Sequence, residues 1–205
     1  VLSTTQVGTL SRTQLASVTA TQFSSLPNTA MQALSTTQTA ALPATLMGAM
    51  TSLQLRALTP EQIASLSATQ IAAIPCTALK GMTATQCAVL TATQLAAFST
   101  SQVPYLSIEA TAALDESQLA TLSTTQFASF STAQIKSLQP AQLASLPQTL
   151  ITALTSSQCA AFNMSQICQL TPTQIAQMTL TQLSGLSSTH VSAMSEAQFA
   201  ALTET

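Results

Sequence analysis

Four cysteines are the most reactive side chains of this chain, and they fall into two pairs. Cys76 is soon followed by Cys87, and Cys159 is soon followed by Cys168. Cysteines that meet in the fold of an exported protein can be joined by disulfide bonds, whereas a buried unbridged cysteine acts as a small hydrophobic side chain. The sequence leaves two interpretations open, which are the bridges Cys76–Cys87 and Cys159–Cys168 or four unbridged thiols.

Other candidates for acid, base or metal chemistry are few and scattered. His190 is the only histidine, and Asp115 and Glu116 are the only adjacent carboxylates. A metal site needs several Cys, His or carboxylate ligands in one place, and covalent catalysis needs a nucleophile beside a base. We therefore expect no catalytic residue, no metal and no cofactor, and we expect that the protein is not an enzyme. His190 is expected to make the backbone contact of the glutamine that it replaces.

Hydroxyl side chains are abundant, and three interpretations of them remain open. Most simply, they cap helices and hydrate the surface. Alternatively, an exported stalk rich in Ser and Thr can be O-glycosylated. In the third interpretation, regularly spaced threonines on a weakly charged face bind ice.

All of these residues belong to a repeat of eight. Every eighth residue from Leu2 to Leu202 is apolar, and no insertion or deletion interrupts the series. We number the positions of each octad from this residue, so that residues 2–201 hold 25 octads. The octad 90–97 is typical and reads LTATQLAA, with a hydroxyl at position two, Gln at position five and an apolar residue at position six. Self-similarity at a fixed period indicates a repeat architecture.

Positions two and five form the pattern of a helix capping box. The hydroxyl accepts a hydrogen bond from the backbone N–H three residues later, and the Gln side chain reaches back to the N–H of the capping residue. Positions one and six are then the two partners of a hydrophobic staple. Proline agrees with this register, because Pro60, Pro140 and Pro172 all stand at position three, the first helical residue. Charge agrees as well, because all six acidic residues lie at positions two to four, near the helix N-terminus.

A cap in every octad predicts one short helix per repeat and an all-α solenoid. A single long helix is disfavoured, because a period of eight would spread the apolar stripe around the cylinder. Non-Leu residues at position one fall almost entirely in odd-numbered octads, and departures from Gln at position five fall almost entirely in even-numbered ones. We therefore predict two repeats per coil, which gives a 16-residue coil. We expect residues 1–205 to form one continuous array that is a segment of a longer one.

Composition excludes several classes of protein. The chain is 46% hydrophobic with a net charge of −2, which is unlike a disordered segment. Four Lys and Arg residues in total cannot form the basic surface that nucleic acid requires. Polar residues interrupt every apolar stretch, so that we expect no membrane span.

The octad 58–65 reads LTPEQIAS. With this octad and its neighbours, the chain resembles the LTxxQ-type octapeptide arrays of very large bacterial surface or secreted proteins. The resemblance covers the whole chain and rests on a short motif. It implies an exported structural segment, and it carries over no catalytic or binding residue.

These observations lead to a functional expectation. We expect a structural repeat protein that forms a rigid extracellular rod, stalk, sheath or filament, located outside the cell or at its surface. Self-association end to end or laterally would build the filament, since little charge keeps the chains apart. The alternative is an adhesin or ice-binding surface presented on the regular Thr- and Ser-rich face, with a glycan or another surface ligand that the sequence does not identify.

Overall fold

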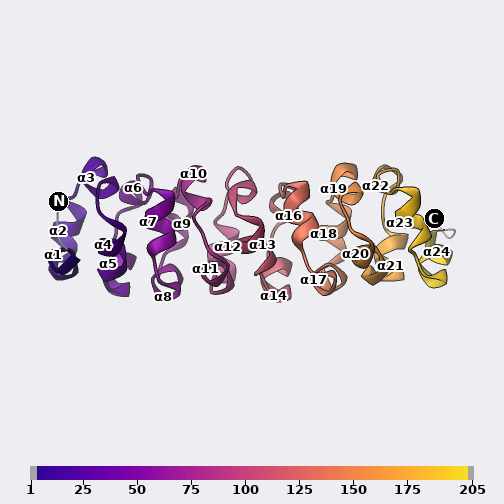
Figure 1. The fold of residues 1–205 in the computed structure, drawn as a ribbon, viewed down its shortest axis with the longest axis horizontal. Helices are drawn as coiled ribbons and strands as arrows, with labels where there is room; N and C mark the ends of the chain where they lie inside the picture. The colour runs from indigo at the N-terminus through magenta and orange to yellow at the C-terminus, as the bar shows by residue number, and fades with distance from the viewer. Residues whose placement is uncertain (1–3, 203–205) are drawn as a thin grey trace. The chain divides into compact units, whose positions relative to one another are not determined.

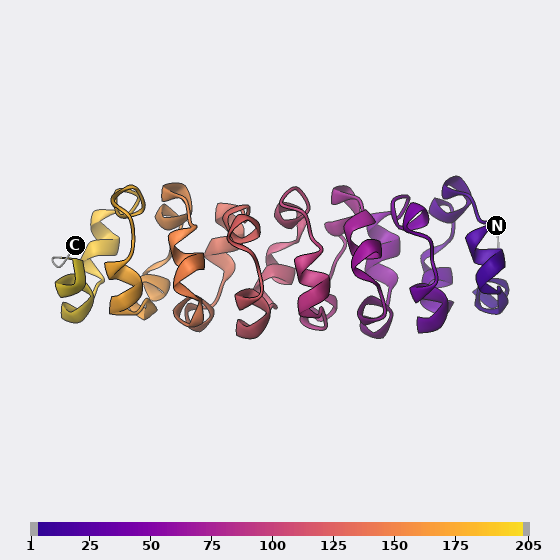
Figure 2. The ribbon, with the colours of Figure 1, turned by 180° about the vertical axis from the view of Figure 1, so that it is seen from behind.

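A computed structural model describes residues 4–202 of the chain. The chain divides into two compact units, Val1–Ala113 (unit 1) and Leu114–Thr205 (unit 2). In the described part of each unit, short helices follow one another along the chain, and Figures 1 and 2 show them from opposite sides. No strand occurs in residues 4–202, so that the prediction of an all-α solenoid with one short helix per octad is confirmed.

The helices correspond one to one with the octads. In unit 1 they are α1 (Thr4–Thr9), α2 (Arg12–Ala16), α3 (Ala20–Ser24), α4 (Asn28–Ala33), α5 (Thr36–Ala40), α6 (Ala44–Met47), α7 (Ser52–Ala57), α8 (Pro60–Ala64), α9 (Ala68–Ala73), α10 (Cys76–Leu79), α11 (Ala84–Ala88), α12 (Ala92–Ala96), the 3₁₀ helix η1 (Val103–Tyr105) and α13 (Ile108–Ala112). In unit 2 they are α14 (Glu116–Ala120), α15 (Thr124–Ala128), α16 (Thr132–Ser137), α17 (Pro140–Ser145), α18 (Gln148–Thr152), α19 (Ser156–Ala160), α20 (Met164–Gln169), α21 (Pro172–Ala176), α22 (Leu180–Leu183), α23 (Ser188–Ser192) and α24 (Glu196–Leu202).

The start of most helices is fixed by the predicted capping box. At the N-terminus of α8, the Thr59 hydroxyl accepts from the Gln62 N–H at 3.2 Å, and Gln62 Oε1 accepts from the Thr59 N–H at 2.7 Å. Thr59 itself is extended, with φ −74° and ψ 159°, so that the backbone changes direction at the capping residue. The same box forms in most octads of both units, which confirms the register read from the sequence.

Proline explains where the box is modified. Four octads carry proline at position two, namely Pro27, Pro43, Pro75 and Pro147, and none of their helices has a side-chain cap. Proline has no N–H for a glutamine to accept from, which accounts for Ala or Leu at position five of these octads. In the octad 98–105, Pro104 at position seven removes a helical donor, and only the 3₁₀ helix η1 forms.

Three helices, and not two, make one coil. Within each unit, helices pack against the helix three octads away, as α4 does on α7 and α7 on α10 in unit 1, and as α17 does on α20 in unit 2. The predicted 16-residue coil is therefore wrong, and the coil has 24 residues. The prediction relied on the alternation between odd-numbered and even-numbered octads. In the structure, octads three apart stack on one another, so that an odd-numbered and an even-numbered octad share one environment.

The core consists of the position-one and position-six side chains. Leu58 and Ile63 of one octad are 3% and 0% exposed, respectively, as the hydrophobic staple requires. Position eight is a site of close approach in some coils. A Cβ atom added to Gly81 would lie 1.9 Å from the Ser52 carbonyl oxygen, so that glycine is required where α10 crosses α7. Within residues 4–202, no helix is long and apolar enough to cross a membrane.

Candidate functional site

The sequence left two interpretations of the four cysteines open, disulfide bridges or unbridged thiols. All four are thiols, and no disulfide joins Cys76 to Cys87 or Cys159 to Cys168 in the structure. The Cys76 thiol donates to the Ser101 carbonyl at 3.4 Å, and the Cys168 thiol donates to the Ala193 carbonyl at 3.3 Å. Both acceptors lie 25 residues later in sequence, because a side chain at these positions faces the following coil and not the adjacent octad.

Two of the cysteines are core residues. Cys87 and Cys159 stand at position six and are each 0% exposed, which confirms their interpretation as small buried hydrophobic side chains. Burial raises the pKa of each thiol to about 12, because a thiolate would lose its hydration there. These two thiols therefore stay protonated and are poor nucleophiles at neutral pH.

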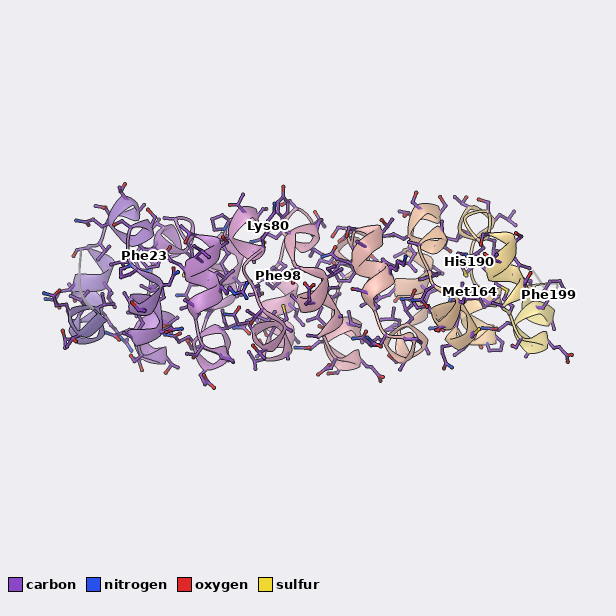
Figure 3. All side chains as sticks on the ribbon, in the orientation of Figure 1. Phe23, Lys80, Phe98, Met164, His190 and Phe199 are labelled. Atoms are coloured by element: carbon purple, nitrogen blue, oxygen red, sulfur yellow. The ribbon has the colours of Figure 1, made fainter. Side chains whose placement is uncertain are left out.

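His190 makes the contact that was predicted for it. It lies at the third position of α23, is 8% exposed, and its Nδ1 accepts from the Ser187 N–H at 3.2 Å. The Ser187 hydroxyl in turn accepts from the His190 N–H at 3.2 Å. The imidazole thus completes a capping box, and Figure 3 shows it in unit 2.

The adjacent carboxylates Asp115 and Glu116 start helix α14. Asp115 is the capping residue, and its carboxylate accepts from the Ser117 hydroxyl at 2.6 Å and from the Gln118 N–H at 2.7 Å. These two donors, the hydroxyl first, hold the pKa of Asp115 below its usual value. Among the described residues, no group of three or more His, Cys, Asp or Glu side chains lies close enough to hold a metal ion.

The most regular feature of both units is a second function of the position-five glutamines. Gln166 in α20 is 0% exposed, and its Oε1 accepts from the Asn163 N–H at 2.8 Å. Its Nε2 donates to the carbonyls of Ile135 at 2.9 Å and Leu138 at 2.7 Å, in and just after α16. One amide therefore caps the N-terminus of its own helix and the C-terminus of a helix in the preceding coil.

The same two acceptors recur at a constant separation. Glutamine Nε2 donates to the carbonyl 31 residues earlier, at position six, and to the carbonyl 28 residues earlier, at position one, as Gln62 does to Met31 and Leu34. We call these contacts the glutamine ladder. Donors to a preceding coil are Gln38, Gln54, Gln62, Gln70, Gln86, Gln94 and Gln102 in unit 1, and Gln142, Gln158, Gln166, Gln174, Gln182 and Gln198 in unit 2.

The glutamine ladder provides hydrogen-bond donors for backbone carbonyls at the C-terminal ends of the short helices. The last four carbonyls of a helix have no partner within that helix, and burying them unpaired is costly. The glutamine amide reaches these carbonyls from the next coil while its oxygen stays on its own capping N–H. The sequence contained one signal of this function: a capping box accepts Glu or Gln, yet position five never carries Glu, which has no N–H to donate.

A comparison with known protein families also identifies a repeat in this chain. The family model of the ALTTAQ repeat matches residues 111–147 of the chain. The chain is a repeat protein. The matched residues of this repeat protein include complete octads from α14 to α17, in which Leu or Phe stands at position one, the N-cap residue at position two and Gln at position five. The comparison with curated proteins gives no match to this repeat protein.

Proposed function

We propose that this chain is a structural repeat segment that forms a rigid rod, stalk, sheath or filament. The glutamine ladder carries the proposal. Within each unit it joins a coil to the preceding one through buried backbone acceptors, at the same two separations in both units. In such a solenoid each repeat is stabilised by its nearest neighbours alone, so that the array can be lengthened without changing its construction. A stiff spacer of adjustable length is what this construction serves best.

We further propose that the protein acts outside the cell or at its surface and that it is related to the LTxxQ-type octapeptide arrays of very large bacterial proteins. The octad 58–65 carries the Leu, hydroxyl and Gln of that motif at the same spacing. The low charge of the chain supports self-association, end to end or laterally, because repulsion between copies is weak. Labelling of intact source cells with an antibody against the chain tests the location, and labelling only after lysis would contradict it.

Small-angle X-ray scattering tests the rod. Variants lengthened by one or two copies of a 24-residue coil, for example a duplicate of residues 58–81, preserve the packing of each helix on the helix three octads away. The largest dimension of the particle should then grow in equal steps. A globular particle would instead grow with the cube root of its mass, and that result would reject the rod.

One observation favours the second candidate, an adhesive or ice-binding surface. Helices α3, α6, α9 and α12 pack on one another in that order in unit 1. Each presents an exposed threonine at position four, and these are Thr21, Thr45, Thr69 and Thr93. Thermal hysteresis of the chain tests this candidate, with Thr45→Lys and Thr69→Lys as the disrupting changes and Thr13→Lys and Thr37→Lys as controls. A freezing point that equals the melting point would reject ice binding.

A further inference from the structure

Basic residues are rare in this chain, but two of them stack on successive coils of unit 1. Helices α4, α7, α10 and η1 pack on one another in that order, and we call such a stack a column. Arg56 in α7 and Lys80 directly after α10 stand at position seven, which most octads fill with Ala, Gly or Ser. Both side chains are exposed and lie one 24-residue coil apart. We call Arg56, Lys80 and the neighbouring Tyr105 the basic stripe.

No carboxylate of the same column neutralises the basic stripe. Its octads, residues 26–33, 50–57, 74–81 and 98–105, contain neither Asp nor Glu. Lys80 Nζ lies over the Tyr105 ring, 5.5 Å from its centroid, in a cation–π contact. Tyr105 is 39% exposed, and Figure 3 labels Lys80. The stripe therefore presents two cations and one aromatic ring at the spacing of the coil.

In unit 2 one column differs from all others at its capping residues. Position two is Ser, Thr or Pro in every complete octad except three, and these carry Asp115, Gln139 and Asn163. The three residues precede α14, α17 and α20, which pack on one another in that order. The replacements thus recur with the period of the coil and not of the octad, which marks one side of unit 2 as chemically distinct.

Two hollows follow each other along this column. The first, of about 570 Å³ between α14 and α17, is lined by Asp115, Glu116 and Gln139, and we call it the acidic hollow. The second, of about 550 Å³ between α17 and α20, is lined by Gln139, Pro140 and Met164, and we call it the methionine hollow. The Glu116 side chain is exposed, and Met164, labelled in Figure 3, is 45% exposed. Like the cations of the basic stripe, the hollows are one coil apart.

We propose that the basic stripe of one copy of this chain packs against the two hollows of a second copy, with Arg56 in the acidic hollow and Lys80 with Tyr105 at the methionine hollow. This inference rests on the proposed function, because it specifies the lateral association of the rods. The partner is a second copy, since the same chain carries both complementary surfaces.

Charge, spacing and chemistry support this contact. Unit 1 holds three basic and two acidic residues, whereas unit 2 holds one basic and four acidic residues, so that unlike units of two copies attract each other. The equal spacing lets both contacts form in one register. The order along the chain requires that the two copies run in the same direction. At the methionine hollow, the Tyr105 ring meets the Met164 thioether, which is a favourable pairing.

The contact does not depend on the ends of the array. Both surfaces lie on the sides of inner coils, and repeats added before or after the chain would leave them exposed. Because the two surfaces differ and every copy carries both, the contact is heterologous, and each added copy can receive another. The result is a staggered lateral assembly.

Sedimentation velocity over a range of protein concentrations tests the contact. The wild type should form oligomers that dissociate as the salt concentration rises, because salt screens exposed charges. In Arg56→Glu the association constant should fall by at least about tenfold, since like charges then face each other. Arg12→Glu makes the same charge change at an exposed position of unit 1 outside the stripe, and it should assemble like the wild type.

A charge swap tests the pairing and its direction. Arg56→Glu/Glu116→Arg restores opposite charges at the acidic hollow and should regain the association of the wild type. Lys80→Glu/Glu116→Arg should stay weakly associated, because Arg56 then faces an arginine. All substituted positions are exposed, so that each variant should keep the circular dichroism spectrum of the wild type. Recovery in the second double variant, or in neither, would overturn the proposal.

The outcomes also separate this contact from the rod itself. A wild type that stays monomeric at low salt, or oligomers that neither salt nor Arg56→Glu weakens, would overturn the contact. The scattering series on lengthened variants measures the shape of a single chain at concentrations where it is monomeric. An elongated monomer would retain the rod whatever the result of sedimentation, whereas a globular monomer would reject the rod.

Discussion

The Gln166 amide donates from Nε2 to the Leu138 carbonyl at 2.7 Å, across 28 residues of sequence. The same amide accepts from the Asn163 N–H at 2.8 Å, and no part of it is exposed to solvent. One side chain thus satisfies backbone groups at the beginning of one helix and at the end of another. Repetition of this relationship joins successive coils within each unit.

Removal of a single ladder amide should destabilise the fold. In Gln166→Ala the buried Leu138 carbonyl loses its glutamine donor, the Ile135 carbonyl keeps only the Leu138 N–H, and the half-buried Asn163 N–H loses its acceptor. We expect the free energy of unfolding to fall by about 2–4 kcal/mol, since each buried unpaired group costs on the order of 1–3 kcal/mol. Urea unfolding followed by circular dichroism measures it. The matched control is Gln169→Ala in the same helix, where the side chain is exposed and the change should stay within about 0.5 kcal/mol. Equal losses in the two variants would contradict the ladder.

Glycine is required at position 81 but not at position 48. A Cβ atom in Gly81→Ala would lie 1.9 Å from the Ser52 carbonyl oxygen, so that α10 must move away from α7. We expect a loss of about 2 kcal/mol or more in unfolding free energy, as for other overpacked sites. In Gly48→Ala the nearest atom would lie 3.4 Å from the new Cβ atom, which is an ordinary contact. Because alanine lowers the conformational entropy of the unfolded chain, this change should stabilise the protein by about 0.5 kcal/mol. Thermal unfolding of the two variants should shift in opposite directions.

The cysteines should react in two classes. At pH 8 the exposed Cys168 thiol should be alkylated quickly, and the partly exposed Cys76 thiol more slowly. Burial raises the pKa of Cys87 and Cys159 to about 12, so that both should resist the reagent until the protein unfolds. Mass spectrometry after alkylation, without reductant, counts the modified thiols. Four additions in denaturant confirm thiols, whereas two or none would reveal the bridges that the sequence left open.

Asp115 should make the stability of the fold depend on pH in the acidic range. Its folded-state pKa is lowered by the Ser117 hydroxyl and the Gln118 N–H, so that the ionised form is favoured in the native state. The contribution is fully present above the unfolded pKa of about 3.9 and is lost as the pH falls through the folded pKa. Asp115→Asn keeps a capping oxygen without a charge, as Asn163 does at α20. The difference in melting temperature between wild type and variant should therefore shrink from pH 6 to pH 2, and a constant difference would refute this function of Asp115.

Pro147 and Leu150 should show coupled effects. A double-mutant cycle with Pro147→Thr and Leu150→Gln rebuilds the capping box that α18 lacks. Leu150→Gln by itself buries an amide oxygen opposite a proline that has no N–H, and it should destabilise the protein. The threonine supplies that N–H, so that the coupling free energy should be favourable by roughly 1 kcal/mol. Strict additivity of the two changes would mean that the loss of the box does not explain the missing glutamine.

Local interactions explain what could be predicted from the sequence. The capping hydroxyl of Thr59 and the reach of Gln62 act within a few residues, so that their spacing alone reveals the helix start, the register and the buried Leu58 and Ile63. The backbone contact of His190 was predictable for the same reason. The cysteine bridges had no such basis, because Cys76 and Cys168 face a later coil and not the adjacent octad.

By itself, then, the sequence determined one short helix per eight residues and the two apolar positions, one and six, that lie before and within that helix. Only the tertiary structure decided that three helices close a coil, because that number depends on the backbone turn between helices and on packing across 24 residues, which leave no mark on an eight-residue pattern. The tertiary structure also determined which carbonyls accept from the Nε2 group of each glutamine in the ladder. The donor of Gln166 finds its acceptors 28 and 31 residues earlier, where no local rule of spacing reaches.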